Sequence, residues 1–306
     1  MTISEAPSNV ALIKYMGKLD GNVPRNVSLS YTLDKFRTTV YLENCSNEDR
    51  FVNDIGLDQK SVDRFLRHLQ NIKKLYDYNG YFSVRSLNNF PHSAGVASSS
   101  SSFAALTKCA ITAICKMKAA AIPSPEEMSV ISRTASGASC RSFFAPWSVW
   151  DRDGARKIDI KIKELNHDLI LVDIRPKKVS SSKAHKLVET SPLFADRPSR
   201  AEKRFVDLVN ALNCDRWNDA CQICWEEFAD MHGLFETSSP SFGYISSKTK
   251  VVLNAIKNFR RLNGDSPITT IDAGPNVHLL WRKDQEEARS ELKKEILSLD
   301  KDFIVI

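Results

Sequence analysis

Residues 88–106 read NNFPHSAGVASSSSSFAAL, and this stretch does most to decide the fold. An expected strand leads through Pro91 and Gly95 into small hydroxyl residues, and Ser98 then opens an apolar helical stripe. A helix N-terminus presents unpaired N–H groups and a positive dipole end, so it favours phosphate. The direct passage into an apolar helix argues against a flexible serine-rich linker, and there is no G-x-x-x-x-G-K-[ST] pattern of a Walker A loop. The stretch therefore predicts a phosphate-binding loop.

Three further stretches carry side chains that suit an anionic substrate. Asp272 stands in DAGPN after an expected strand, where a carboxylate can orient or deprotonate a hydroxyl, although the same letters also form an ordinary turn. Lys14 and Lys18 follow the first apolar strand and are either solvated or turned toward a cavity. Arg141 lies in SGASCRS, where a glycine-broken helix offers an N-terminus and a guanidinium can clamp a phosphate. Each stretch alone leaves both alternatives open.

The composition is that of an ordinary globular protein. Of 306 residues, 42% are hydrophobic and 26% are charged, and the net charge of +6 comes without the dense basic clusters typical of nucleic-acid binding. No apolar run reaches the roughly 20 residues of a membrane helix, and the N-terminus does not resemble a signal peptide. Cys221 and Cys224 fall on one helical stripe with Trp217 and Phe228, which predicts core packing rather than a metal site. We expect a cytoplasmic protein that binds no nucleic acid, no membrane and no metal through its own side chains.

The chain begins rich in strands and continues rich in helices. Strands are expected at 10–15, 28–33, 37–43, 81–86, 157–163, 169–174, 268–272, 278–281 and 303–306. Helices are expected at 59–76, 98–117, 124–136, 140–144, 198–213, 215–232, 248–263 and 285–298, with Ser124 as an N-cap and Gly264 as a C-terminal cap. This order predicts an α+β protein, divided by a polar stretch into domains 1–166 and 167–306.

Taken together, IKYMGK, PRNVSLS, the serine-rich loop, SGASCRS, VETS and DAGPN resemble the mevalonate diphosphate decarboxylases, a family of the GHMP kinase superfamily. The resemblance covers nearly the whole chain. It implies an S5-like N-terminal part that binds ATP, a ferredoxin-like C-terminal part, and an active site in the cleft between them. It also implies ATP- and Mg²⁺-dependent conversion of mevalonate 5-diphosphate to isopentenyl diphosphate, ADP, phosphate and carbon dioxide in isoprenoid biosynthesis, by a homodimer.

The resemblance further implies roles for single residues. Asp272 matches the catalytic aspartate beside the tertiary 3-hydroxyl of the substrate, as a base or as an orienting group, and Lys14 is assigned to catalysis with it. Substrate-binding positions match Tyr15, Lys18, Ser139, Arg141 and Ser191. ATP-binding positions match Asn89, Gly95, Ser98 and Ser99.

Some positions depart from the family pattern. Met16 replaces the tryptophan of IKYWGK, Val27 replaces the first serine of NSSLS, and Ala138 replaces a serine, with Ser139 offering a hydroxyl one position later. A Gly-Met pair is absent where 184–185 read Ala-His. These changes leave open a decarboxylase for mevalonate monophosphate, a GHMP-type kinase without decarboxylation, and a binding protein that kept only the fold. Retention of all four charged site residues argues against the last.

Overall fold

The computed structural model describes residues 1–54, 56–90, 98–175 and 177–306. The strands are β1 (Thr2–Ile13), β2 (Ser28–Cys45), β3 (Arg50–Val52), β4 (Tyr81–Asn88), β5 (Trp147–Asp151), β6 (Gly154–Lys157), β7 (Asn166–Leu171), β8 (Ile268–Ile271), β9 (Val277–Trp281) and β10 (Ile304–Val305). The α-helices are α1 (Gln59–Leu75), α2 (Ser98–Met117), α3 (Pro125–Ala135), α4 (Ser181–Leu187), α5 (Arg197–Asn213), α6 (Trp217–Glu236), α7 (Ser247–Asn263) and α8 (Glu286–Leu299). The fold is therefore α+β, as the element order predicts.

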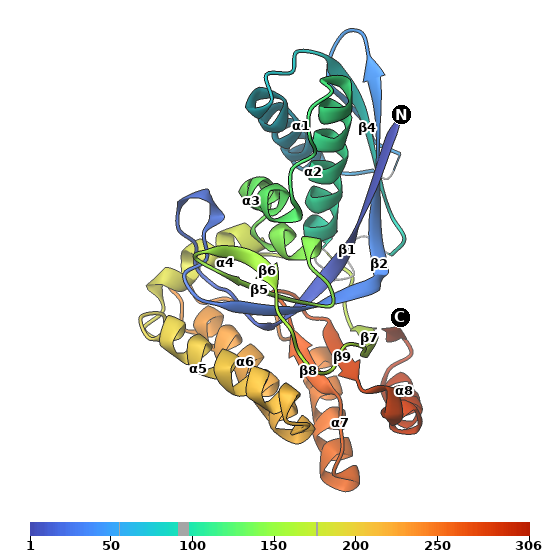
Figure 1. The fold of residues 1–306 in the computed structure, drawn as a ribbon. Coiled ribbons are helices and arrows are strands. Elements are labelled where there is room, and N and C mark those ends of the chain that lie inside the picture. Colours follow the sequence, from blue (N-terminus) through green and yellow to red (C-terminus); the bar gives the residue numbers. More distant parts are fainter. Residues whose placement is uncertain (55, 91–97, 176) are drawn as a thin grey trace.

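Two sheets divide these strands between the two ends of the chain (Figure 1). The N-terminal sheet has the order β3-β4-β2-β5-β6, with β1 paired to β2, and the C-terminal sheet has the order β10-β7-β9-β8. In Figure 1, α1, α2 and α3 lie on one side of the long β1–β2 pair, whereas α5 to α8 gather around the C-terminal sheet. The changeover falls between Lys157 and Asn166. A domain boundary at residue 166 stays a prediction.

The long strand β2 replaces two separate strands expected at 28–33 and 37–43, so that expectation was wrong. β2 pairs with β1 at residues 29–33 and 37–42, and the register shifts between Pro7 and Ser8, where Arg37 and Leu33 are the successive partners. The extra residues on β2 form an irregularity that keeps both flanking segments in one sheet. The residues between the two expected strands thus remain part of one strand.

Local capping signals set several helix ends as predicted. α2 begins at Ser98. Ser124 accepts a hydrogen bond from the Glu127 N–H, and Glu127 accepts one from the Ser124 N–H, which completes the capping box of α3. α7 ends at Asn263 and is capped by Gly264, whose φ of 69° is left-handed and favours glycine.

An apolar core joins the two parts of the chain. Val10 of β1 and Trp147 of β5 belong to the same buried cluster as Leu208 of α5, Cys224 of α6 and Leu280 of β9. The α6 stripe of Trp217, Cys221, Cys224 and Phe228 is buried, which confirms core packing for its two cysteines. Because the two sheets share a core, the strand ends that meet between them are held in fixed relative positions. No described helix has the length and apolar character needed to cross a membrane.

In the middle of the chain one expected strand is absent and one helix was not expected. The alternating segment 157–163 is not a strand: β6 ends at Lys157, yet Ile160 is fully buried and Ile158 and Ile162 pack against the core. The alternation therefore reflects one buried side of a segment that leaves the sheet after Lys157. The polar segment after β7 contains α4, begun by Ser180, whose hydroxyl accepts the Lys183 N–H. Only two of the seven α4 residues are buried, so the sequence shows no helical stripe.

Candidate active site

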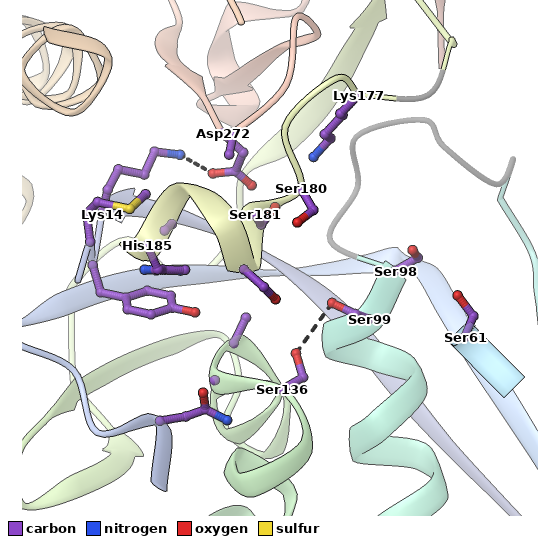
Figure 2. Close-up of a pocket in the computed structure, with 18 of the residues that line it drawn as sticks. Lys14, Ser61, Ser98, Ser99, Ser136, Lys177, Ser180, Ser181, His185 and Asp272 are labelled. Carbon is purple, nitrogen blue, oxygen red and sulfur yellow. Dashed lines mark hydrogen bonds and ion pairs between the residues drawn. The ribbon is translucent and has the colours of Figure 1, made fainter. Parts of the chain in front are cut away.

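A cavity of about 760 Å³ lies where the two parts meet (Figure 2). Its walls come from the ends of β1, β8 and α2, from the turn after α3, and from α4. Of the side chains predicted to act, those that line it are Lys14, Tyr15, Lys18, Ser98, Ser99, Arg141 and Asp272. The structure thus brings together residues that lie up to 258 positions apart in the sequence.

An ion pair between Lys14 and Asp272 crosses the cavity from one part of the chain to the other. β1 ends at Ile13 and β8 at Ile271, so each charged residue is the first after its strand. Lys14 Nζ donates to Asp272 Oδ1; the Lys14 side chain is 3% exposed and that of Asp272 is 27% exposed. Burial alone would raise the pKa of Asp272, but Lys14, His278 and Arg141 together outweigh it and lower that pKa to about 2. Asp272 is therefore a carboxylate at neutral pH.

The backbone of Lys14 is held by a second, fully buried ion pair. The Lys14 N–H donates to Glu227 Oε1 at 2.9 Å, and Arg197 Nη2 donates to the Lys14 carbonyl at 2.7 Å. Arg197 and Glu227 also pair with each other, and both side chains are 0% exposed. A residue that leaves a sheet inside the protein must find new partners for its N–H and C=O, and here a charged pair from α5 and α6 supplies them. The pair therefore fixes where the Lys14 side chain starts.

Arg141 is a buried cation without a carboxylate partner among the described residues. It lies in a 3₁₀ turn, Gly137–Phe143, is 4% exposed, and donates from Nη1 to the Ser28 hydroxyl. Its guanidinium carbon lies 5.5 Å from the centre of the Tyr15 ring and 5.7 Å from that of Trp150. No described group accepts a hydrogen bond from its Nε. Burial lowers the pKa of Arg141, which marks the charge as poorly compensated.

Two more cations and one histidine complete this side of the cavity. Lys18 is half-buried and donates to the Asn22 side chain at 3.2 Å, and burial lowers its pKa. Lys177 is exposed at the rim, close to the backbone of Gly274 after Asp272. His185 of α4 stacks on Tyr15, with ring centres 4.7 Å apart. The cavity therefore carries more positive than negative charge around the Lys14–Asp272 pair.

The N-terminus of α2 forms the opposite wall. Figure 2 shows Ser98 and Ser99 at the first turn of α2, with Ser99 beside Ser136; their hydroxyls are 3.4 Å apart. A smaller neighbouring cavity is lined by Ser98, Ser99, the α1 residues Ser61 and Arg64, and Phe103. A helix N-terminus presents backbone N–H groups and a positive dipole end, so this end of α2 suits phosphate. Gly95 lies outside the described residues.

Three predicted ligand residues do not line either cavity in the described structure. The Ser139 hydroxyl accepts from Ser132 at 2.7 Å and donates to the Ser136 carbonyl at 2.6 Å, so it is used within the wall. Ser191 bonds the Thr237 hydroxyl at 2.7 Å. Because neither residue lines a cavity in this structure, the contacts of Ser139 and Ser191 with a ligand stay predictions.

Asn89, the third of these residues, instead holds the bend in β2. Its side chain accepts from the Arg37 N–H at 2.8 Å and donates to the Lys35 carbonyl at 2.9 Å. Its neighbour Asn88 lines the smaller cavity. A contact of Asn89 with a nucleotide therefore also stays a prediction.

The departures from the family pattern fall in different places. Val27 is buried in the shared core, away from the cavity. Met16 is buried against Ala184 and also lines the cavity, as does Ala138. Because Ser139 is engaged elsewhere, Ala138 leaves this part of the wall with one hydroxyl fewer than the family pattern.

Sequence reasoning missed several residues of the site. Arg64 and Ser61 lie on an amphipathic helix whose pattern gives no sign of a ligand. Lys177 belongs to a polar stretch that could equally be solvated. One feature of the sequence could have indicated His185: residues 184–185 read Ala-His where the family pattern has Gly-Met. Among the described residues, no group of three or more His, Cys, Asp or Glu side chains could hold a metal ion.

Comparison with known proteins gives consistent matches along the chain. Residues 6–160 match the family model described as the diphosphomevalonate decarboxylase-like N-terminal domain, and residues 169–303 match the mevalonate 5-diphosphate decarboxylase C-terminal domain. A diphosphomevalonate decarboxylase of Ganoderma lucidum is 29% identical over 94% of this chain and 80% of its own. The crystal structure of a mevalonate diphosphate decarboxylase from Legionella pneumophila is 41% identical, with a TM-score of 0.93 over 100% of this chain and 99% of that chain. A structure described as MDDEF in complex with MVAPP, AMPPCP and magnesium is 30% identical, with a TM-score of 0.88 over 99% and 95%.

Proposed function

We propose that this chain, which belongs to the diphosphomevalonate decarboxylase family, uses ATP and Mg²⁺ to convert mevalonate 5-diphosphate into isopentenyl diphosphate, ADP, phosphate and carbon dioxide. The site offers the Lys14–Asp272 ion pair and an excess of cations, with Lys18 and Arg141 outside any ion pair with a described carboxylate, in a cavity bordered by the N-terminal end of α2. A tertiary alcohol that bears a carboxylate and a diphosphate matches this arrangement of charges. The relative solved with MVAPP, AMPPCP and magnesium supports the same assignment.

The observation that carries the proposal is the buried, uncompensated Arg141. An ionised group taken out of water is costly unless an opposite charge or several hydrogen bonds meet it. Here the Ser28 hydroxyl and two ring faces are its described partners. An anionic group of the substrate supplies what is missing, because a guanidinium binds carboxylate or phosphate through two parallel hydrogen bonds.

The Lys14–Asp272 pair is the proposed catalytic centre. A carboxylate whose pKa is about 2 is a weak base, so Asp272 first orients the 3-hydroxyl and takes its proton only when the oxygen has largely bonded to phosphorus. Lys14 holds Asp272 ionised and places positive charge next to the transferred phosphoryl group. Phosphorylation makes the 3-oxygen a good leaving group. As phosphate departs with the electrons of the C3–O bond, the bond between C2 and the carboxylate carbon breaks, its electrons form the C2=C3 double bond, and the carboxylate leaves as carbon dioxide.

The residues present fit a nucleotide with magnesium. The first turn of α2 offers N–H groups and the hydroxyls of Ser98 and Ser99, and Arg64 and Lys177 line the same cavity. Mg²⁺ is commonly held by nucleotide phosphates with few protein ligands. When bound, ATP supplies the transferable phosphoryl group and Mg²⁺ neutralises its charge. The chain's own part is to place the acceptor hydroxyl in line with that group.

The test is to incubate the purified protein with ATP, Mg²⁺ and either mevalonate 5-phosphate or mevalonate 5-diphosphate. We expect ADP and carbon dioxide in equal amounts with the diphosphate. ADP without carbon dioxide would identify a kinase that stops at the phosphorylated product. Activity with the monophosphate alone would reassign the substrate, in line with the hydroxyl missing at Ala138. Release of neither product from a protein that binds ATP would refute an enzyme of this family's chemistry.

The assembly and location of the protein belong to the same proposal. A homodimer in the cytoplasm is expected from the resemblance and from the composition. Light scattering coupled to size-exclusion chromatography measures the mass directly, and a value near one chain of 34.5 kDa would contradict the dimer.

A further inference from the structure

His185 has the position and hydrogen-bonding state of a ligand contact, although nothing in the family pattern gives it a role. It lies on α4 with 7% of its surface exposed, and it lines the large cavity. Figure 2 shows its ring beneath α4, on the side of the cavity that holds Lys14. The Tyr15 ring packs against one face of the imidazole at an angle of 29°. The ring orientation is thus fixed by stacking.

A backbone hydrogen bond decides which ring nitrogen carries the proton. The Gly17 N–H donates to His185 Nδ1 at 3.1 Å, so Nδ1 holds a lone pair and no hydrogen. Gly17 has a φ of 84°, and a Cβ there would come within 2.5 Å of the Phe194 ring, so this donor is tied to a glycine backbone. The neutral imidazole must then carry its hydrogen on Nε2.

The surroundings keep the imidazole neutral. Burial, reinforced by the nearby Lys18 and Arg141 charges, lowers the pKa of His185 to about 3. No described residue hydrogen-bonds Nε2, and this atom is not sealed from the cavity. His185 therefore offers one N–H donor, in fixed orientation, beside two cations that need an anion.

We propose that His185 is a substrate-specificity residue, whose Nε2–H donates a hydrogen bond to a phosphate oxygen of the mevalonate phosphate. This rests on the proposed function. Lys18 and Arg141 attract the anionic group by charge, whereas a neutral donor adds direction without adding another buried cation. A donor at this position also offsets the hydroxyl that Ala138 no longer provides on the wall of the same cavity.

Two isosteric variants separate the cavity donor from the packing role. In His185→Asn the side-chain oxygen can still accept from the Gly17 N–H, but no donor reaches the Nε2 position. In His185→Gln the side-chain nitrogen can reach the Nε2 position, but the acceptor for Gly17 is lost. Binding of mevalonate 5-diphosphate without ATP is measured by calorimetry, and the Michaelis constants for both substrates by release of ADP and carbon dioxide.

We expect His185→Asn to weaken substrate binding about tenfold to a hundredfold, the range for a hydrogen bond to a charged group. His185→Gln should stay within about threefold of the wild type, and the Michaelis constant for ATP should change in neither variant. Unweakened binding in His185→Asn, or equal weakening in both variants, would overturn the role of the Nε2 donor. A wild-type protein that releases no carbon dioxide would instead overturn the proposed function, so the two failures are distinguishable.

Discussion

Replacing Asp272 with Asn tests the catalytic centre most directly. The change keeps the size of the side chain and its capacity for hydrogen bonds, but it removes the negative charge that faces Lys14. The amide cannot accept the hydroxyl proton. Turnover should therefore fall by about two to four powers of ten, the range for a positioned acid–base group. The Michaelis constant for the mevalonate phosphate should change little, because Arg141 and Lys18 still meet the anionic groups.

The same variant should lose stability by an amount that the pKa of Asp272 sets. Its lowering from 3.8 to about 2 corresponds to about 2.5 kcal/mol, at about 1.4 kcal/mol for one pKa unit. Because the folded pKa is the lower one, this stabilisation is complete above the unfolded pKa of about 4 and is lost as the pH falls through about 2. At pH 7 the Asn variant should thus unfold up to about 2.5 kcal/mol more easily. Its activity must be measured well below its melting temperature.

The assay is steady-state release of ADP and carbon dioxide, with urea unfolding on the same samples. Asp265→Asn is the matched control, because Asp265 is also ion-paired, to Arg282, at the other end of β8. We expect the control to keep turnover within about twofold of the wild type. Turnover within about tenfold of the wild type in Asp272→Asn would refute the catalytic assignment. Loss of carbon dioxide with ADP release intact would restrict Asp272 to the decarboxylation step.

The remaining predictions concern binding and support. Arg141→Gln should raise the Michaelis constant for the mevalonate phosphate at least about tenfold and leave that for ATP nearly unchanged, since an anion clamp is lost; equal rises for both would contradict this. Ser98→Ala should raise the Michaelis constant for ATP severalfold in steady-state kinetics, and no change would argue against phosphate at the α2 end. Glu227→Gln should lower the free energy of unfolding by about 3 kcal/mol, because Arg197 loses a fully buried partner. Glu226→Gln on the same helix is its control in urea unfolding, and equal losses would contradict the special role of the buried pair.

Sequence reasoning succeeded where the signal is local. The capping box at Ser124, the start of α2 at Ser98 and the left-handed Gly264 depend on a few neighbouring residues, so the letters suffice to predict them. The pairing of Lys14 with Asp272 is not local, and only resemblance to a family placed both residues at one site. The buried stripe around Cys224 was predictable because its helical spacing repeats over several turns.

Other features depend on contacts that no short segment contains. The merging of two expected strands into β2 requires the β1 register shift at Pro7, which becomes visible only when the strands pair. The segment 157–163 alternates because Ile160 is buried in a core contributed by distant strands and helices, although only Lys157 of the segment belongs to a strand. Ser139 and Ser191 resemble ligand residues in the sequence, yet nearby hydroxyl and carbonyl groups already use their hydrogen-bonding capacity. Whether a serine hydroxyl bonds a ligand or a neighbouring protein group depends on tertiary packing, which the sequence does not show.

The two buried charge clusters of the site have opposite physical characters, and this difference explains how the site works. Arg197 and Glu227 compensate each other, so they act as a fixed support for the Lys14 backbone whatever is bound. Arg141 has no described carboxylate partner, so in the free protein it keeps an unmet cost of desolvation. An anion that binds to it recovers that cost, and binding therefore also stabilises the fold. The compensated Arg197–Glu227 pair thus lies where the geometry must stay fixed. The uncompensated Arg141 lies where a multiply anionic substrate must be held.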